Sequence, residues 1–356
     1  MNLKKLLAYS AAAGATALLA GRLQRHRRRI DFQDQCVIIT GGSRGLGIEL
    51  ARQFAAEGAK LALLARDETE LERAKNELRD EYGADVLTQV CDIRQQQEIR
   101  RAIQRVRQRF GHIEVLINNA GVIEFGPAEH MEREDYEEAM GIHFWAPLQL
   151  MREVLPEMRS RGRGRIVNIA SIGGLVSLPH ALPYCASKFA LVGLSNGLRD
   201  EFRRHGVRVT TVCPGLMRTG SHYHAQFKGQ HRKEFVWFAT ANAMPAVSSS
   251  ARRAAEKILD ACRHGDPFLV INFSARVAHL TDTLFPGLLA RVFQMSCRML
   301  PGETDLFGNE ARSGWQSQST LAPSWFTRRA DAAAAANNQL LPEAGEDEPL
   351  QPEWSG

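Results

Sequence analysis

The sequence predicts an α/β fold built on a parallel β-sheet, and two stretches of the chain carry this prediction. The run CVIIT at residues 36–40 is a short β-branched strand, followed by the glycine-rich turn GGSRGLG and the helical pattern IELARQFAAEG. Further along, the strand-like run RIVNIAS at residues 165–171 precedes a helical pattern that begins near Pro183. Strands that alternate with helices in this way are typical of a parallel sheet with helices on its faces.

Composition places the chain among ordinary globular proteins. It has 356 residues, of which 44% are hydrophobic and 24% are charged, enough for a substantial core. The formal net charge is +5, and an arginine cluster at residues 22–29 contributes much of it. The basic residues form no stripe with groove-reading elements, so we expect no nucleic-acid partner. The six cysteines lack C-x-x-C spacing and histidine partners, which predicts reduced, buried thiols and no metal site.

An uncharged run at residues 6–21 lies between two lysines and that arginine cluster. As a helix it would be about 24 Å long, short of the ~30 Å hydrocarbon core but within reach when flanking side chains snorkel. We therefore expect residues 1–30 to form a membrane anchor or an interfacial helix. A secretory signal peptide and a non-spanning amphipathic or disordered arm are the alternatives. The arginines after the run favour a body that faces the cytoplasm.

The turn after the first strand has the glycines that a dinucleotide-binding turn requires. Gly41 permits a tight turn, Gly45 lets the backbone approach a phosphate, and Gly47 allows close packing of the helix. The amino terminus of the following helix favours a pyrophosphate, and we include Leu46 among the cofactor-binding residues. A purely structural turn is the alternative, but the position between a strand and a helix favours cofactor binding.

Tyr184 and Lys188 form a candidate catalytic pair. On a helix they lie on one face, a turn apart. A cation within ~4–6 Å favours a phenolate, so we expect Lys188 to lower the pKa of Tyr184 from its usual value of about 10. Ser171, on the preceding loop, would hydrogen-bond the substrate oxygen that Tyr184 protonates or deprotonates. A surface helix with a chance Y-x-x-x-K is the alternative.

The spacing G-x-x-x-G-x-G, with S-x12-Y-x-x-x-K downstream, resembles the short-chain dehydrogenase/reductase family over roughly residues 34–272. The resemblance implies a doubly wound (Rossmann) fold with a seven-stranded parallel sheet and helices on both faces. It implies that Asp92 holds the adenine amino group and that Ile93 packs on the ring. It also implies that Asn119 of N-N-A-G approaches the adenosine ribose and that Thr219 contacts the nicotinamide carboxamide. Without the resemblance, Asp92 would be interpreted as a helix N-cap.

The end of the second strand bears on the choice of cofactor. The run KLALLA at residues 60–65 is followed by Arg66 and Asp67. A 2′-phosphate is usually bound by an arginine near this point, whereas free ribose hydroxyls are held by an acidic residue. Arg66, together with Ser43 and Arg44 of the glycine turn, therefore predicts NADP(H). In the alternative, Asp67 holds the ribose and Arg66 is solvated.

Position 143 departs from the family pattern. The resemblance implies an asparagine there, which holds a water that relays protons to the lysine, but the stretch GIHFWA places His143 at this position. A histidine can hold a water too, although it titrates near neutral pH and would compete electrostatically with Lys188. His143 can therefore be interpreted in three ways: it holds an altered proton relay in an active enzyme, it impairs catalysis, or it is only a packed residue of the helix.

The last third of the chain is less regular. Residues 220–247 are aromatic and rich in histidine, so we expect a lid over the substrate, with surface histidines at 222, 224 and 231. Apolar residues at helical spacing from Val277 to Met299 are interrupted at Pro286, which predicts two helices. Core or dimer packing and a membrane-facing substrate entrance both agree with that spacing. We expect one domain at residues 31–305 and a disordered, low-complexity tail at residues 306–356.

Together these features predict an enzyme that interconverts a ketone and a secondary alcohol with NADP(H). Hydride would move between nicotinamide C4 and the carbonyl carbon while Tyr184 exchanges the proton, Lys188 holds the nicotinamide ribose and Ser171 steadies the carbonyl. The anchor and the apolar late helices suggest a lipid-like substrate such as a 3-ketoacyl, sterol or long-chain carbonyl compound. The resemblance also allows a homodimer. A non-catalytic nucleotide-sensing module, motivated by His143, and a membrane scaffold are the alternatives.

Overall fold

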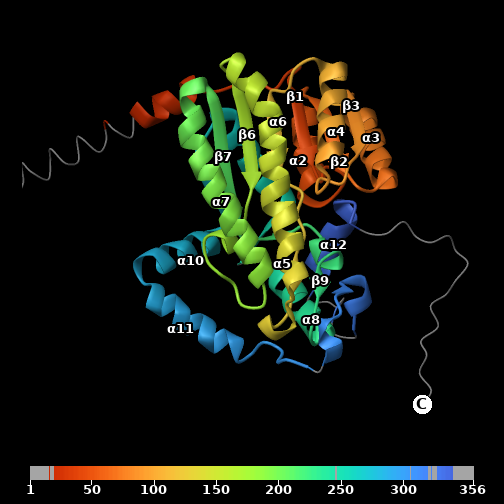
Figure 1. The fold of residues 1–356 in the computed structure, drawn as a ribbon, viewed down its shortest axis with the longest axis vertical. Helices are drawn as coiled ribbons and strands as arrows, with labels where there is room; N and C mark the ends of the chain where they lie inside the picture. Colours follow the sequence, from red (N-terminus) through yellow and green to blue (C-terminus); the bar gives the residue numbers. More distant parts are fainter. Residues whose placement is uncertain are drawn as a thin grey trace, which may run out of the picture.

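The computed structural model describes residues 16, 20–244, 247–304, 306–319, 322 and 327–339. A seven-stranded parallel sheet lies at its centre, in the order β11-β7-β6-β4-β1-β2-β3 (Figure 1). The strands are β1 (Cys36–Thr40), β2 (Lys60–Ala65), β3 (Val86–Val90), β4 (Val115–Asn118), β6 (Gly164–Ile169), β7 (Val207–Pro214) and β11 (Phe268–Ile271). The predicted doubly wound α/β fold with seven parallel strands is confirmed.

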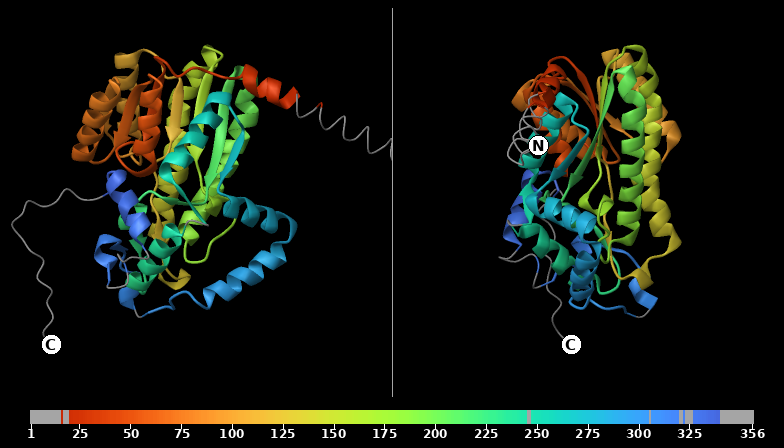
Figure 2. Two further views of the ribbon diagram at one scale, coloured as in Figure 1. Left: turned by 180° about the vertical axis from the view of Figure 1, so that it is seen from behind. Right: turned by 90° about the vertical axis from the view of Figure 1, so that its left-hand side faces the viewer.

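Helices cover both faces of the sheet (Figure 2). One face carries α2 (Gly45–Ala56), α3 (Glu68–Tyr82) and α9 (Ala251–His264), whose apolar residues share one core cluster with the strands. The other face carries α4 (Gln96–Phe110), α6 (Ala146–Ser160) and α7 (Leu182–Phe202), which pack in a second cluster. The strands are therefore buried on both sides, which explains their continuous apolar runs.

The strand order reverses direction between β1 and β4, and this reversal positions the site. From β1 the chain runs outward through β2 and β3, and it then crosses to β4 and continues the other way. Ligands of such sheets bind beyond the carboxyl ends of the strands at this switch point. Asn118 at the end of β4 donates a 2.7 Å hydrogen bond to Asn168 of β6, and Asn119 donates one of 3.0 Å to the Thr40 carbonyl. These amides brace three strand ends beside the crevice.

The chain after β7 forms a smaller layer below the carboxyl ends of the strands (Figure 1). It contains α8 (His231–Ala243), and α5 (Arg133–Met140) lies nearby. Short strands make two small sheets: β8 (Leu216–Arg218) with β10 (Ser248–Ser250), and β9 (Gln226–Phe227) with β5 (Glu124–Phe125) and β12 (Arg312–Ser313). As predicted, the apolar late segment is split at Pro286, into α10 (Phe273–Leu284) and α11 (Pro286–Cys297).

The predicted anchor at residues 6–21 lies almost entirely outside the described residues. Residues 20–27 are helical, and Arg25 pairs with Asp266 of the loop before β11 at 2.8 Å. Within the described ranges, no helix is long and apolar enough to cross a membrane.

The prediction of a disordered tail from residue 306 is wrong for the part that the structure describes. Residues 328–336 form α12 (Arg328–Ala336), in which Ala330 and Ala334 are buried. Alanine has the highest intrinsic helix propensity, and tertiary contacts supply most of the stability of a short helix. The composition of the tail shows that it is of low complexity, but it does not show that this segment packs against α2 and the lid region of the same chain.

Candidate active site

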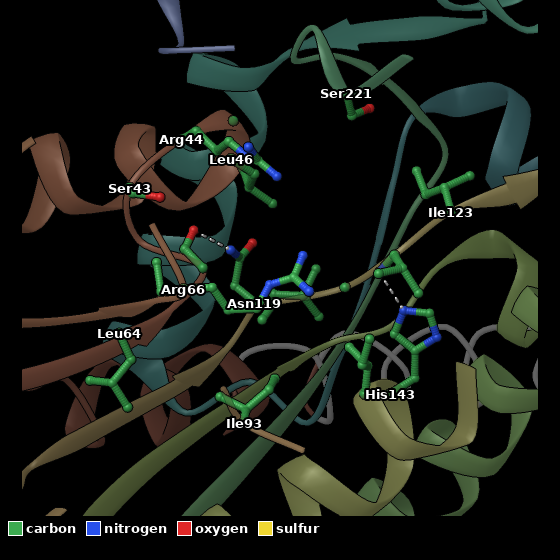
Figure 3. Close-up of a pocket in the computed structure, with 18 of the residues that line it drawn as sticks. Ser43, Arg44, Leu46, Leu64, Arg66, Ile93, Asn119, Ile123, His143 and Ser221 are labelled. Carbon is green, nitrogen blue, oxygen red and sulfur yellow. Dashed lines mark hydrogen bonds between the residues drawn. The ribbon is translucent and has the colours of Figure 1, made fainter. Parts of the chain in front are cut away.

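A cavity of about 500 Å³ lies beyond the carboxyl ends of the central strands, and Figure 3 labels ten of the residues that line it. All but one of the residues predicted to bind the cofactor line it: Gly41, Ser43, Arg44, Gly45, Leu46, Arg66, Asp92, Ile93, Asn119, Tyr184, Lys188 and Thr219. The exception is Gly47, which packs behind the turn. A Cβ there would lie 1.8 Å from the carbonyl oxygen of Gly41, so only glycine fits.

The glycine turn has the geometry that a dinucleotide needs. Gly41 and Gly45 have φ angles of +62° and +61°, in the left-handed region that favours glycine. α2 begins at Gly45, which lines the cavity, so the positive end of the helix dipole lies beside it. The residues present therefore fit the pyrophosphate of a nicotinamide dinucleotide.

Two of the three groups predicted to bind a 2′-phosphate, Ser43 and Arg44, are joined by Glu70, which the sequence analysis missed. The Ser43 hydroxyl donates to one oxygen of the Glu70 carboxylate at 2.8 Å, and Arg44 donates to the other at 2.7 Å. Arg66 is exposed and lines the same cavity. Asp67, the alternative ribose ligand, instead caps α3 by accepting the Glu70 backbone N–H at 2.8 Å. Ser43, Arg44 and Arg66 thus line one part of the cavity, the anion site, and could bind an anion there. In this structure, the Glu70 carboxylate is the anion that Ser43 and Arg44 bind.

Asp92 lines the cavity but does not cap a helix. Its carboxylate accepts hydrogen bonds from the backbone and the guanidinium of Arg94, at 3.0 Å and 2.6 Å. These bonds hold the pKa of Asp92 below its usual value. α4 begins four residues later, at Gln96, so the interpretation of Asp92 as an N-cap is wrong.

The three predicted catalytic residues come from adjacent elements. Ser171 follows β6 and accepts the Gly173 backbone N–H at 3.0 Å. Tyr184 and Lys188 lie on α7, and the Lys188 ammonium is 5.6 Å from the centre of the tyrosine ring. Lys188 donates a 2.9 Å hydrogen bond to the Ile169 carbonyl at the end of β6. The pair therefore points into the cavity from one helix turn, as the sequence predicts.

Burial, however, sets the proton affinities of this pair. It raises the pKa of Tyr184 to about 12, and a hydrogen bond with Ser171 acts in the opposite direction. It lowers the pKa of Lys188 to about 7. The prediction that Lys188 lowers the pKa of Tyr184 is therefore wrong for this state of the protein, because the lysine is itself only partly charged at neutral pH. Tyr184 is a neutral phenol that can donate a proton.

His143 lies beside this pair in a turn of π-helix, Gly141–Trp145, between α5 and α6. Its Nε2 accepts the Val122 backbone N–H at 3.1 Å (Figure 3), and its Nδ1 is 2.8 Å from the Ser187 hydroxyl. Because Ser187 donates its proton to the Tyr184 carbonyl at 2.8 Å, His143 carries its proton on Nδ1. Both ring nitrogens are therefore engaged by protein groups.

The expectation that His143 titrates near neutral pH is also wrong. Burial, and then the charge of Lys188, hold its pKa well below the usual value. His143 is therefore a neutral ring that packs at right angles to Tyr184, with ring centres 5.4 Å apart. The π-turn explains its position, because the extra residue in the turn directs the ring toward α7.

The region predicted as a lid contributes to a second cavity of about 420 Å³. This cavity adjoins the first and shares Tyr184, Arg44 and Arg66 with it, among other residues. Lys228 is buried there and pairs with Asp135 at 2.6 Å and with Glu124 at 3.8 Å. Burial, reinforced by Asp135, raises the pKa of Glu124 to about 7. The sequence analysis missed this charged group, because Lys228 is about a hundred residues from the two acidic residues in the sequence.

The lid histidines are not on the surface as expected. His222 is buried, and all three bind the C-terminal part of the chain: His222 to Asp331, His224 to the Gln339 carbonyl and His231 to Ser317. In the part of the chain that the structure describes, no group of histidine, cysteine and acidic residues is arranged to hold a metal ion. Five cysteines are buried and Cys297, on α11, is exposed.

Comparisons with known proteins agree on one family. The short chain dehydrogenase family matches residues 35–227. "Dehydrogenase/reductase SDR family member 7B" of Danio rerio is 33% identical over 302 residues, covering 83% of this chain and 96% of that protein. A granaticin polyketide synthase putative ketoacyl reductase of Streptomyces violaceoruber is 39% identical over 51% of this chain and 67% of its own length. The solved structure of L-sorbose reductase from Gluconobacter frateurii, complexed with NADPH and L-sorbose, is 26% identical, with a TM-score of 0.62 over 68% of this chain and 97% of that one.

The anion site predicts a test of cofactor preference. Arg66→Ala should weaken NADPH binding about tenfold or more, because a hydrogen bond to a charged group contributes ~1.5–3 kcal/mol and 1.4 kcal/mol is about a factor of ten. NADH lacks the 2′-phosphate, so its dissociation constant should stay the same. Fluorescence titration with both cofactors measures this. Arg79→Ala, near the far end of α3, is the control because it removes the same charge away from the cavity. If both substitutions weakened NADPH binding equally, Arg66 would not be a ligand of the 2′-phosphate.

The depressed pKa of His143 predicts a pH dependence of stability. In the unfolded chain the imidazole takes up a proton below about pH 6.5, which the buried ring resists. The wild type should therefore lose stability as the pH falls below this value, by up to ~1.4 kcal/mol per pH unit, and His143→Asn should not show this contribution. Urea unfolding of both proteins at pH 7.5 and pH 5.5 measures the difference. A stability gap between them that does not change with pH would show that His143 takes up a proton as readily in the folded state as in the unfolded state, and it would contradict the depressed pKa.

Proposed function

Because the chain belongs to the short chain dehydrogenase family, we propose that it is a membrane-associated reductase that converts a lipid-like ketone to a secondary alcohol, or the reverse. The protein is an NADP-dependent oxidoreductase acting on CH–OH and C=O groups. The observation that carries the proposal is the position of Tyr184, which lines both the dinucleotide cavity and the second cavity. A proton donor there can reach a substrate in one cavity and lies beside the cofactor in the other.

In the proposed reaction the cofactor supplies the hydride and residues of the chain supply the proton and bind the carbonyl oxygen. The NADPH-bound L-sorbose reductase and the anion site of Ser43, Arg44 and Arg66 support NADP(H) as the cofactor. NADPH supplies a hydride from its nicotinamide ring. Tyr184, neutral at pH 7, donates the proton to the carbonyl oxygen, and Ser171 holds that oxygen.

Lys188 has two roles in this proposal. Its ammonium, fixed on the Ile169 carbonyl, stabilises negative charge on the tyrosine oxygen after proton transfer, and it offers its other protons to the ribose hydroxyls. Because its pKa is about 7, its charge is present below that value and is lost above it. Alcohol oxidation requires the opposite proton movement, with Tyr184 as the acceptor.

The second cavity supports a substrate with both a polar and an apolar part. Its lining includes the apolar residues Val122, Ile123 and Pro183, and it also includes Lys228 with its ion pair. A carbonyl in an apolar chain would lie against the first group, with a polar end toward Lys228. The putative ketoacyl reductase among the relatives favours a 3-ketoacyl compound over a sterol.

The exposed face of α10 and α11 supports membrane association. Large apolar side chains stand in solvent on it, and among them Phe273 is 82% exposed, Met295 68% and Leu288 55%. Arg276 and Arg291 are exposed on the same two helices, and Arg298 is exposed directly after α11. An apolar face with basic neighbours is typical of a helix that lies on an anionic lipid surface. With the arginine cluster at residues 22–29, this supports a catalytic domain on the cytoplasmic side.

The catalytic proposal is tested by following NADPH oxidation with purified protein and a panel of ketones. A 3-ketoacyl thioester should be reduced with at least about tenfold higher kcat/KM than a ketone without the chain. Tyr184→Phe should lower kcat by ~10²–10⁴ and leave the dissociation constant of NADPH unchanged, because only the proton donor is lost. NADPH binding without oxidation of any ketone would support a nucleotide-sensing module instead.

The membrane proposal is tested with a chain that starts at residue 20, so that the run at 6–21 does not contribute. It should float with vesicles that contain anionic lipid. The double change Leu288→Glu and Met295→Glu should abolish flotation, whereas Gln294→Glu on the same helix should have little effect. A stable dimer in solution that the double change dissociates would assign this face to a second copy of the chain.

A further inference from the structure

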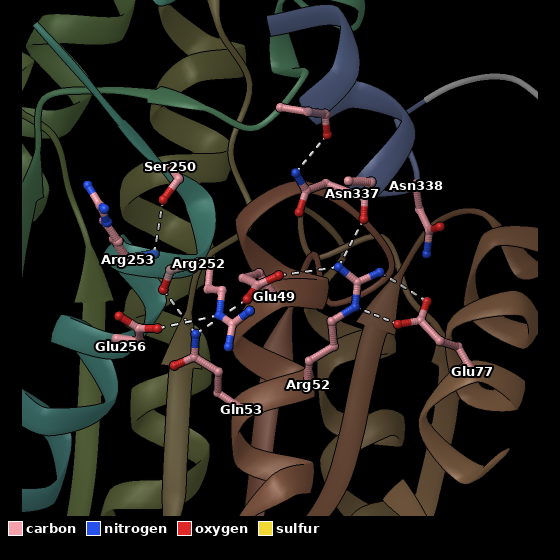
Figure 4. Close-up of polar contacts among 12 residues, drawn as sticks. Glu49, Arg52, Gln53, Glu77, Ser250, Arg252, Arg253, Glu256, Asn337 and Asn338 are labelled. Atoms are coloured by element: carbon pink, nitrogen blue, oxygen red, sulfur yellow. Dashed lines mark hydrogen bonds and ion pairs between the residues drawn. The ribbon is translucent and has the colours of Figure 1, made fainter. Parts of the chain in front are cut away.

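The C-terminal segment, residues 327–339, lies against the glycine turn, and its helix α12 lies below the carboxyl ends of the strands (Figure 1). The Gly45 backbone N–H donates a 2.8 Å hydrogen bond to the Asn337 carbonyl. About two turns further along α2, Arg52 donates to the Ala336 carbonyl at 2.9 Å while it pairs with Glu49 and Glu77 (Figure 4). The segment is therefore fixed to the helix whose amino terminus faces the cofactor cavity.

The same segment is bound from the other side by the lid. Asp331 accepts a hydrogen bond of 2.8 Å from the Tyr223 hydroxyl and lies 3.3 Å from His222. At the end of the segment, His224 donates to the Gln339 carbonyl at 2.9 Å. These contacts connect α2 to the lid, and they place Gln339 between the two.

The Gln339 side chain has an unsatisfied polar atom at this junction. Gln339 is only 4% exposed, and its Oε1 has no hydrogen-bond partner among the described residues. The side chain lines both cavities, and its Nε2 lies 2.6 Å from where a Cβ on Gly45 would be. Oε1 is an acceptor and cannot bind an anion, but the Nε2 amide group also has no acceptor in the described ranges. A nearly buried N–H donor without a partner is costly, so Nε2 points to a ligand that accepts a hydrogen bond beside Gly45.

The backbone of the glycine turn narrows the choice of ligand. The Gly45 N–H is used by Asn337, and the N–H groups of Gly47 and Ile48 point to the Arg44 carbonyl. The Leu46 N–H has no acceptor in the described part of the chain, and Leu46 lines the same cavity as Gln339. The free N–H of Leu46 and the nearby Nε2–H of Gln339 are two donors at a helix amino terminus. Such donors are suited to the oxygens of a phosphate group.

We propose that Gln339 binds the diphosphate of NADP(H), and that the C-terminal segment holds it in place as part of the cofactor site. The inference rests on the assignment of NADP(H) as the cofactor and adds a residue that lies outside the region matching the family, residues 35–227. The Gln339 amide N–H would donate to a diphosphate oxygen opposite the Leu46 N–H. Cofactor binding and the order of the C-terminal segment would then depend on each other.

Direct binding of two nucleotides to the full chain tests this proposal. Gln339→Ala should raise the dissociation constant of NADPH about tenfold or more, because the lost bond goes to a charged group. It should leave that of 2′-AMP, which carries the 2′-phosphate but no diphosphate, within about twofold. Gln339→Glu keeps the shape of the side chain and adds a negative charge, so it should weaken NADPH binding further than Gln339→Ala does.

The outcomes separate this proposal from the assignment of the cofactor. If the wild type binds NADPH and Gln339→Ala binds it equally well or more tightly, Gln339 is not a diphosphate ligand. An equal loss for NADPH and 2′-AMP would show a general distortion of the site and also overturn the proposal. If the wild type binds neither nucleotide, the assignment of the cofactor itself fails.

Discussion

The Lys188 ammonium is buried against the carbonyl of Ile169, at the carboxyl end of β6, and the chemistry of the site depends on this contact. The hydrogen bond holds α7 against the carboxyl end of β6, and it thereby sets the position of Tyr184, which lies one helix turn from Lys188. The same burial lowers the pKa of Lys188 to about 7 and raises that of Tyr184 to about 12. Desolvation disfavours the charged form of each group, so the pair is closest to neutral when the site is most enclosed. The site is therefore prepared to give a proton rather than to take one.

The surroundings of the pair hold this arrangement from three directions. His143 connects the π-turn to α7 through Ser187 and remains neutral. Asn118 and Asn119 fix the strand ends from the sheet side. The lid and the C-terminal segment close the remaining side through contacts between residues about a hundred positions apart. A neutral histidine at position 143 can support the geometry without repelling the lysine, so the departure from the family asparagine is compatible with an active enzyme.

The sequence predicted those features that depend on local residue patterns. The alternation of strands and helices, the glycine turn with Gly47 packed on Gly41, and the break before Pro286 follow from short stretches of chain, whereas the number of seven strands came from the family resemblance. It did not predict features that depend on which distant groups meet. Glu70 was one of many acidic residues on a helix, and only the fold brings it to Ser43 and Arg44. The pKa of Tyr184 was predicted in the wrong direction because a sequence shows the neighbouring charge but not the burial. The alanine-rich α12 was predicted to be disordered because its stability comes from contacts with α2 and the lid.

The central claim is that burial keeps Tyr184 a neutral acid at physiological pH, and an ultraviolet titration of its phenol tests this most directly. The phenolate absorbance of the wild type minus that of Tyr184→Phe isolates this one residue. The structure predicts no phenolate from Tyr184 at or below about pH 10, the usual pKa of tyrosine, because its own pKa is about 12. A phenolate signal that appears near neutral pH and is absent from the variant would contradict this account, and it would show that the charge of Lys188 outweighs burial.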